Sequence, residues 1–173
     1  EHVCFVPDAG HQNLIERCIA DSQMTTVALT SEEEGVAMLA GSWLGGKKGL
    51  LLMQSSGVGN CINMLSINQE CRIPILMLVT MRGEWGEFNP WQTTMGQGSR
   101  AALEAVGVIV HRLDEDAQAA ETVRAAARQA PPDRADAAWF RRDAYCLTWC
   151  GSLSGGECRA HLAVRPPGRK SIS

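Results

Sequence analysis

Two continuous apolar runs constrain the fold of this chain most. GLLLM occupies residues 49–53 and ILMLV occupies residues 75–79. A strand that faces water on one side alternates apolar and polar residues, whereas a strand covered on both faces is apolar throughout. Both runs therefore predict central strands of a parallel sheet that carries helices on each side.

The segments around these runs alternate between strand and helix patterns. Further strands are predicted at 4–6, 26–29 and 108–111, and helices at 13–20, 32–44, about 60–69 and 114–129. Residues 80–98 form a polar loop in this prediction, followed by a short helix before the strand at 108–111. Strands separated by helices of this length predict a doubly wound, mainly parallel α/β sheet of about five or six strands.

The composition changes near residue 130. Residues 1–130 carry 9 Lys and Arg against 15 Asp and Glu, whereas residues 131–173 carry 7 against 4. We expect one domain over 1–130 and a C-terminal tail over 131–173 that is loosely packed or partly disordered. The nearest candidate for a last strand is AYCLTW at 144–149. An alternative use of the tail is a zinc site of unfamiliar spacing, made of Cys146, Cys150, Cys158 and His161.

Composition also excludes several classes of function. With 45% apolar and 20% charged residues and a net charge of −3, the chain offers no electrostatic argument for binding nucleic acid or a membrane. No apolar run approaches the roughly 20 residues that span a bilayer. The start has neither a basic segment nor an apolar signal region, and the missing methionine suggests a true start upstream. The seven cysteines are expected to be reduced thiols in a cytoplasmic protein.

A cluster of three glutamates opens the helix predicted at 32–44. Ser31 followed three residues later by Glu34 fits a capping box, and acidic residues are favoured in a first helical turn. A purely structural role is therefore one interpretation. However, the helix that follows is too apolar for a surface helix, so its first turn should lie near the sheet edge where α/β proteins bind ligands.

A glycine-containing segment, QSSGVGN, follows the apolar strand at 49–53. The dinucleotide-binding fingerprint fails because Ile62 stands where its third glycine should be, and no Gly-Lys-Ser/Thr follows for a phosphate loop. A tight turn that needs glycine for its backbone conformation is the structural interpretation.

The two segments together, EEEGVAMLAG and QSSGVGNCIN, resemble the pyrimidine-binding domain of thiamine diphosphate enzymes. More narrowly, they are similar to the α subunit of sulfopyruvate or phosphonopyruvate decarboxylases, over roughly residues 3–130. The resemblance implies a carboxy-lyase subunit that acts on a 3-sulfo- or 3-phosphono-2-oxo acid.

The resemblance also implies which residues face the cofactor. In the family a glycine follows the activating acid by nine positions, so Gly41 indicates Glu32, with Glu33 as the alternative if the register shifts. That glutamate hydrogen-bonds the aminopyrimidine ring of thiamine diphosphate and shares a proton with it. The family's QxSGxGNxxN stretch implies cofactor contacts from Ser56, Gly57, Gly59 and Asn60.

Two further segments resemble the family's substrate-side loops. VPDAGH at 6–11 offers Asp8 and His11, and the segment at 80–98 offers Arg82 and Gln92. A guanidinium suits recognition of a sulfonate or phosphonate. The bland alternatives are that Asp8 caps a helix and that Arg82 pairs with Glu84 or Glu87. Two loop tryptophans, Trp85 and Trp91, suggest a partner surface or a lid, with ordinary packing as the alternative.

The family's second domain, marked by a GDG start and an asparagine-pair end, finds no counterpart in the sequence. The resemblance therefore implies a β subunit that holds Mg²⁺ and the diphosphate, in a homo- or hetero-oligomer. Two alternatives remain open at this point. One is a non-catalytic binding or regulatory module of the same fold, and the other is a subunit of a different thiamine-dependent lyase.

Overall fold

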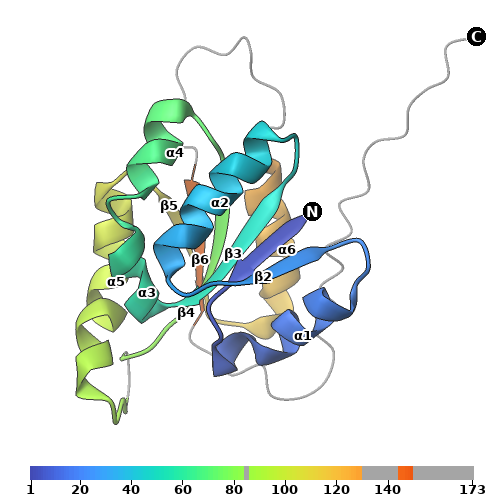
Figure 1. Cartoon of the computed structure of the whole chain (residues 1–173). Helices are drawn as coiled ribbons and strands as arrows, with labels where there is room; N and C mark the ends of the chain where they lie inside the picture. Colours follow the sequence, from blue (N-terminus) through green and yellow to red (C-terminus); the bar gives the residue numbers. More distant parts are fainter. Residues whose placement is uncertain (84–85, 130–143, 150–173) are drawn as a thin grey trace, which may run out of the picture.

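A computed structural model of the chain describes residues 1–83, 86–129 and 144–149. Six strands form one parallel sheet in the order β2-β1-β3-β4-β6-β5 (Figure 1). The strands are β1 (His2–Phe5), β2 (Thr25–Ala28), β3 (Gly49–Gln54), β4 (Ile75–Thr80), β5 (Ile109–Leu113) and β6 (Ala144–Trp149). The prediction of a doubly wound parallel sheet is confirmed.

The helices are α1 (Gln12–Ala20), α2 (Glu32–Leu44), α3 (Ser55–Cys61), α4 (Leu65–Cys71), α5 (Thr93–Ala105) and α6 (Asp116–Gln129), with short 3₁₀ turns η1 (Ala9–His11) and η2 (Pro90–Gln92). None of the described helices is long and apolar enough to cross a membrane.

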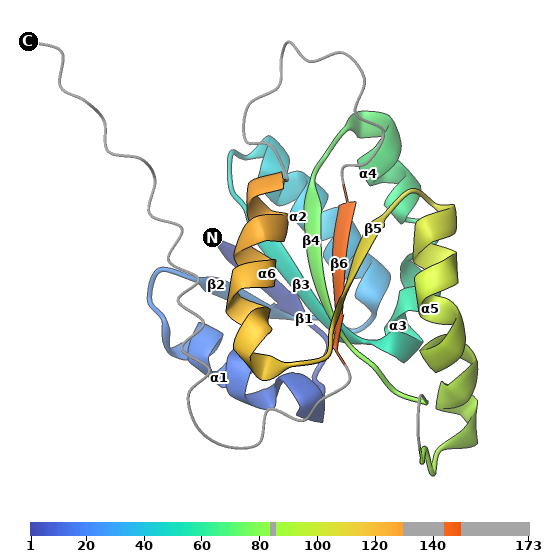
Figure 2. The same cartoon turned by 180° about the vertical axis from the view of Figure 1, so that it is seen from behind.

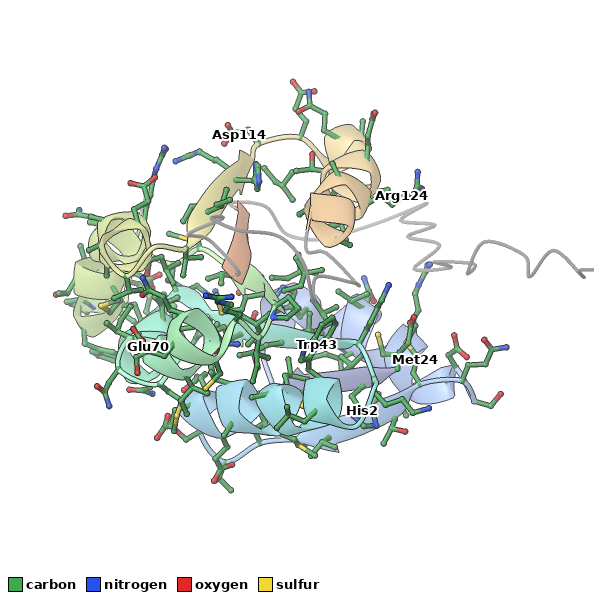
Figure 3. All side chains as sticks on the ribbon, turned by 90° about the horizontal axis from the view of Figure 1, so that it is seen from above. His2, Met24, Trp43, Glu70, Asp114 and Arg124 are labelled. Carbon is green, nitrogen blue, oxygen red and sulfur yellow. The ribbon has the colours of Figure 1, made fainter. Side chains whose placement is uncertain are left out.

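The apolar strands separate two hydrophobic layers. On one face, Leu51, Met53 and Met77 pack with residues of α2, α3, α4 and α5. On the other, Leu50 and Leu52 pack with residues of α1 and α6, which cover the face seen in Figure 2. Viewed from above, Trp43 on α2 and Arg124 on α6 lie on opposite sides of the sheet (Figure 3). The unbroken apolar character of β3 follows from this double covering.

The segment AYCLTW is a strand, as predicted, and it is β6. It pairs with β4 on one side and β5 on the other, so it lies inside the sheet. The domain boundary drawn at residue 130 stays a prediction. Of the proposed zinc set, Cys146 lies on β6, and Cys150, Cys158 and His161 lie outside the described residues.

Two predicted boundaries are wrong in an informative way. The glycine segment is helical, because α3 begins at Ser55 and the helix predicted at about 60–69 is divided between α3 and α4. The predicted loop at 80–98 is also too long, since α5 begins at Thr93. Among the described glycines, positive φ occurs at Gly46, Gly83, Gly86 and Gly107, and so not at Gly57 or Gly59.

Candidate active site at the carboxyl edge of the sheet

The predicted site residues follow the carboxyl ends of strands that run in the same direction. Chain order places β2 and β3 on opposite sides of β1, so the winding direction changes between β1 and β3. Parallel α/β sheets bind ligands outside the carboxyl ends of the strands at such a switch point. The edge from which α3 starts is therefore the candidate site (Figure 1).

Glu32 is the first residue of α2 and is only 7% exposed. Its Oε2 accepts a hydrogen bond of 2.8 Å from Nδ2 of Asn60. A Cβ atom added to Gly57 would stand 2.3 Å from Cδ of Glu32, so the carboxylate lies directly against the backbone of α3. Glycine at position 57 is thus explained by close approach, which corrects the expectation of a tight turn.

The two neighbouring glutamates have different surroundings. Glu33 is half-buried and accepts a hydrogen bond from Oγ of Ser31. Glu34 is exposed and accepts hydrogen bonds from the backbone N–H and the hydroxyl of Thr30, which lower its pKa. The predicted capping box is incomplete, because the Ser31 hydroxyl bonds Glu33 and caps no backbone amide. Of the three, Glu32 is the buried carboxylate that meets the α3 segment.

A second group forms around Asp8, whose side chain is 3% exposed. Oγ1 of Thr80 donates a 2.6 Å hydrogen bond to Oδ2 of Asp8, and Nη2 of Arg82 donates one of 2.9 Å to Oδ1. Asp8 precedes η1 but makes no side-chain capping bond, so the capping interpretation is wrong. The pairing of Arg82 with Glu87 is also wrong, since Glu87 accepts from the backbone N–H groups of Gly83 and Asn89. Glu84 lies outside the described residues.

The charges in this group are set by burial and by hydrogen bonds. Burial acts to raise the pKa of Asp8, but the bonds from Thr80 and Arg82 and the nearby His11 outweigh it, so the pKa is lowered. His11 is 3% exposed, and burial lowers its pKa to about 4 despite the opposing effect of Asp8. Its Nδ1 lies 3.8 Å from Oδ2 of Asp8 and has no hydrogen-bond partner among the described residues. At neutral pH the group therefore holds an ionised Asp8, a charged Arg82 and a neutral His11.

Ser55 joins the two groups. It opens α3 and is fully buried, and its Oγ accepts a 3.0 Å hydrogen bond from the backbone N–H of Arg82. Its carbonyl oxygen accepts from Oγ of Ser99 on α5 at 3.2 Å. The end of β3, which leads to Gly57, is thereby tied to the end of β4, which leads to Arg82.

Apart from Asn60, which donates to Glu32, the remaining predicted residues lie nearby without a described hydrogen bond to either carboxylate. Ser56 is half-buried in the first turn of α3, and Gly59 and Asn60 are exposed further along it. Gln92 is half-buried at the end of η2, and its carbonyl oxygen would lie 2.8 Å from a Cβ on Gly83.

Sequence reasoning missed Thr80 and Ser55. Both stand where an apolar strand ends, Thr80 as the last residue of β4 and Ser55 directly after β3. A polar residue at the carboxyl end of a buried parallel strand is a signal that would have found them.

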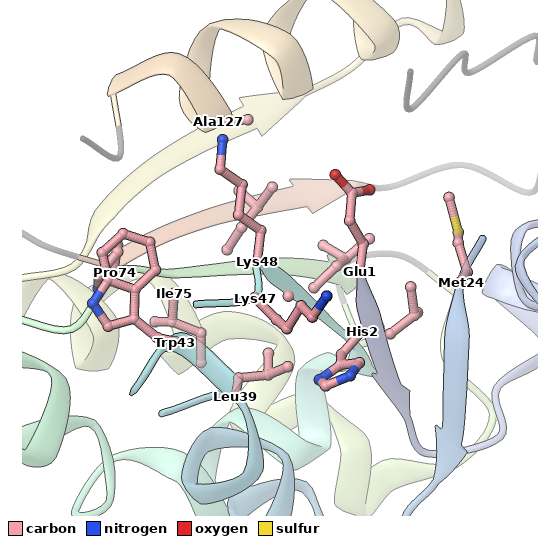
Figure 4. Close-up of a pocket in the computed structure, with 14 residues that line it drawn as sticks. Glu1, His2, Met24, Leu39, Trp43, Lys47, Lys48, Pro74, Ile75 and Ala127 are labelled. Carbon is pink, nitrogen blue, oxygen red and sulfur yellow. The ribbon is translucent and has the colours of Figure 1, made fainter. Parts of the chain in front are cut away.

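A pocket lies at the opposite edge of the sheet, where strands β1, β3 and β4 begin (Figure 4). Trp43, Lys47 and Lys48 line it together with His2, whose Nδ1 lies 2.6 Å from Oγ of Ser42. None of the predicted site residues lines this pocket. The pocket is therefore separate from the site at the carboxyl edge.

The fold is shared with a solved structure. A solved structure from Mycobacterium smegmatis, assigned as a thiamin diphosphate-dependent enzyme, matches with a TM-score of 0.60 over 99% of this chain and 31% of its own. Its sequence identity is 16%, so the likeness concerns the fold. The fold is that of thiamine diphosphate-dependent enzymes.

Sequence comparison narrows the class. No family model matches the chain. It is 35% identical over 119 residues to a sulfopyruvate decarboxylase subunit alpha of Methanothermobacter thermautotrophicus, covering 68% of this chain and 72% of the relative. The corresponding subunit of Methanococcus maripaludis is 37% identical over 109 residues, which are 62% of this chain and 65% of the relative. The phosphonopyruvate decarboxylase of Streptomyces hygroscopicus is 42% identical over 97 residues, which are 55% of this chain and 24% of the relative.

The chain belongs to the sulfopyruvate decarboxylase α-subunit family. The match spans 65% of the α subunit of Methanococcus maripaludis and 24% of the phosphonopyruvate decarboxylase. The predicted family is confirmed.

Proposed function

We propose that this chain is the α subunit of a thiamine diphosphate-dependent decarboxylase that acts on a 3-sulfo- or 3-phosphono-2-oxo acid. The observation that carries the proposal is the position of Glu32. Its carboxylate is buried, lies directly against Gly57 and accepts a hydrogen bond from Asn60. The family membership of the chain supports the same reaction class.

The surroundings of Glu32 fit the pyrimidine half of the cofactor. The bond from Asn60 occupies one acceptor position of Oε2 and fixes the orientation of the carboxylate, which can accept several more hydrogen bonds. Glu32 would thus hold and exchange a proton with the aminopyrimidine ring, with Ser56, Gly57 and Gly59 alongside. When bound, thiamine diphosphate supplies the electron sink for the loss of carbon dioxide.

The group around Asp8 fits the substrate side of such a site. Arg82 uses Nη2 for Asp8, and its Nε is buried without an acceptor among the described residues. The guanidinium therefore retains N–H groups for a sulfonate or phosphonate oxygen. We assign His11, as a neutral imidazole, and Gln92 to the same side of the site.

A partner chain completes the proposed enzyme. The relatives are named as α subunits, which supports a β subunit, and we infer that the β subunit holds the diphosphate and Mg²⁺. We propose a cytoplasmic hetero-oligomer. The buried cysteines Cys4, Cys18 and Cys61 are free thiols, as expected in a reducing compartment.

The test is carbon dioxide release from sulfopyruvate and from phosphonopyruvate by the chain co-purified with its β partner, with thiamine diphosphate and Mg²⁺. Glu32→Gln keeps the shape of the side chain but removes proton exchange, so turnover should fall by about 10²- to 10⁴-fold. Glu33→Gln is the matched control, and its turnover should stay close to that of the wild type because Glu33 bonds Ser31 away from Gly57.

The other outcomes separate the rival functions. A complex that binds thiamine diphosphate but releases carbon dioxide from neither acid would indicate a subunit of another thiamine-dependent lyase. A complex that binds no cofactor would indicate a non-catalytic module and would contradict the proposal.

A further inference from the structure

Thr80 makes a contact that was not predicted from the sequence. It is the last residue of β4 and is 3% exposed, and its hydroxyl donates to Oδ2 of Asp8 at 2.6 Å. Asp8 follows β1, and β3 lies between β1 and β4. The bond therefore joins the end of β4 to the loop after β1, across the carboxyl end of β3.

Both oxygens of Asp8 are held from the same strand end. Thr80 binds Oδ2, and Arg82, two residues later, binds Oδ1 through Nη2 at 2.9 Å. Arg82 is fixed in turn through its backbone N–H, which donates to Oγ of Ser55. The carboxylate is thus the link through which the hydroxyl of Thr80 acts on the orientation of the guanidinium.

The methyl group of Thr80 packs against the loop that carries Asp8. A Cβ atom on Gly10 would stand 2.6 Å from Cγ2 of Thr80 and 2.9 Å from Oδ2 of Asp8. The absence of a side chain at Gly10 lets the methyl group of Thr80 lie directly on the loop. With the methyl group in this position, the hydroxyl of Thr80 donates to Asp8.

We propose that Thr80 is a positioning residue that sets the affinity of the site for the anionic end of the substrate, acting through Asp8 on Arg82. This rests on the proposed function, in which Arg82 recognises a sulfonate or phosphonate. The side chain of Arg82 is 36% exposed, while its Nε is buried without an acceptor among the described residues. In this proposal, the remaining N–H groups of Arg82 point toward the substrate as long as Thr80 and Arg82 hold the two oxygens of Asp8.

The decisive pair of variants is Thr80→Val and Thr80→Ser in the assembled complex. Valine keeps the methyl group and replaces the hydroxyl by a second methyl of similar size, whereas serine keeps the hydroxyl and loses the methyl. Thr80→Val should raise KM for the anionic 2-oxo acid roughly tenfold, with kcat within about twofold, as expected for loss of a hydrogen bond to a charged group. Thr80→Ser should restore KM.

A second readout is the pH profile of kcat/KM. The charged or titratable side chains that act on Asp8 are Arg82 and His11, and the Thr80 bond helps to lower the pKa of Asp8. Without that bond the pKa of Asp8 is lowered less, so the acid limb should move to higher pH in Thr80→Val and return in Thr80→Ser. Repeating the profile in His11→Gln separates the titration of His11 from that of Asp8.

A binding measurement distinguishes failure of this inference from failure of the proposed function. Calorimetry with 3-sulfopropanoate, which has the sulfonate but no reactive carbonyl, needs no turnover. Thr80→Val should weaken its binding about tenfold and leave binding of propanoate, which lacks the sulfonate, unchanged. If the wild-type complex decarboxylates neither acid, but Thr80→Val still binds 3-sulfopropanoate more weakly than the wild type does, the proposed reaction is wrong and the inference about Thr80 stands.

The inference is overturned if Thr80→Val lowers kcat at constant KM, or if Thr80→Ser fails to restore the wild-type KM. It is also overturned if Thr80→Val binds 3-sulfopropanoate as tightly as the wild type does. Should Thr80→Val fail to assemble, Asp8→Asn provides the second test. It removes the charge that orients Arg82 and should give the same selective loss of 3-sulfopropanoate binding. Unchanged binding in Asp8→Asn would also overturn the inference.

Discussion

At the scale of single residues, the site depends on a glycine that makes room for an acid. A methyl group at position 57 would stand 2.3 to 2.4 Å from three atoms of Glu32, so the carboxylate must move in Gly57→Ala. We expect turnover of the assembled complex to fall at least about 100-fold, the range associated with loss of a proton-transfer group. Circular dichroism should show an unchanged fold.

Gly41→Ala is the matched control for that variant. Gly41 is an exposed glycine of α2 with nothing within 4 Å of an added Cβ. Alanine there should stabilise the chain by up to about 1 kcal/mol through its helix propensity and leave turnover unchanged. Equal turnover in Gly41→Ala and Gly57→Ala would contradict the role assigned to Gly57.

His11 makes the stability of the chain depend on pH. Burial lowers the pKa of His11 from 6.5 to about 4, so between these values the unfolded state binds more protons than the folded state. The free energy of unfolding should therefore decrease as pH falls from 7 to 4.5, by roughly 2 to 3 kcal/mol. The lowered pKa of Asp8 adds a further loss only below about pH 4.

Urea titrations of wild type and His11→Gln at pH 7 and at pH 4.5 measure this dependence. The variant should lose most of the difference between the two pH values, because glutamine does not titrate. An undiminished difference would mean that other groups cause it.

At the scale of helices and strands, the sequence predicted the sheet better than the connections around the site. The apolar runs at 49–53 and 75–79 identified β3 and β4 because burial on both faces removes the alternation of polar residues. The segment at 55–61 misled, since two glycines and two serines are typical of a turn. Tertiary contact overrides this local preference. Gly57 in α3 is required by Glu32, which lies 25 residues earlier in the chain.

The residues of the site also differ in how well the sequence predicted them. Glu32 was predicted from a family spacing, whereas the partnership of Asp8 with Thr80 and Arg82 joins residues 72 and 74 positions apart. Local sequence patterns extend over one helix or one strand and contain no information on such pairs. The pairs follow from strand order, which brings the ends of β1 and β4 together across β3.

Helix α5 is positioned on the site loop by a second close approach. A Cβ on Gly96 would stand 1.8 Å from the carbonyl oxygen of Arg82, and neither backbone can yield without moving the helix. Gly96→Ala should destabilise the chain by about 3 kcal/mol, as overpacking against backbone does. Gly98→Ala lies in the same helix with nothing within 4 Å of the added atom, and it should be neutral or slightly stabilising.

Chemical denaturation of the two alanine variants checks this contrast. The difference between them should exceed about 2 kcal/mol, because helix propensity is the same and only the contact with Arg82 differs. Equal midpoints would mean that the loop at Arg82 adjusts without cost.

At the scale of the whole molecule, the proposed site is divided between two chains, and this has a kinetic consequence. The described residues place Glu32 against Gly57, and Asp8 beside Arg82, at one sheet edge. No group of three potential metal ligands occurs among the described residues. If the β subunit supplies the diphosphate and Mg²⁺, turnover requires the assembled complex. Specific activity should then fall on dilution once the subunit concentration drops below the dissociation constant of the complex.

Assays at a fixed subunit ratio over a 1,000-fold dilution series, chosen to span about three decades around the dissociation constant, measure this dependence. Excess β subunit should restore activity at the lowest concentration, because mass action drives assembly. Excess Glu32→Gln chain should instead reduce it, since the variant keeps its surface and competes for the partner. Turnover by this chain alone, constant on dilution, would contradict a divided site and place the whole catalytic apparatus within one protein.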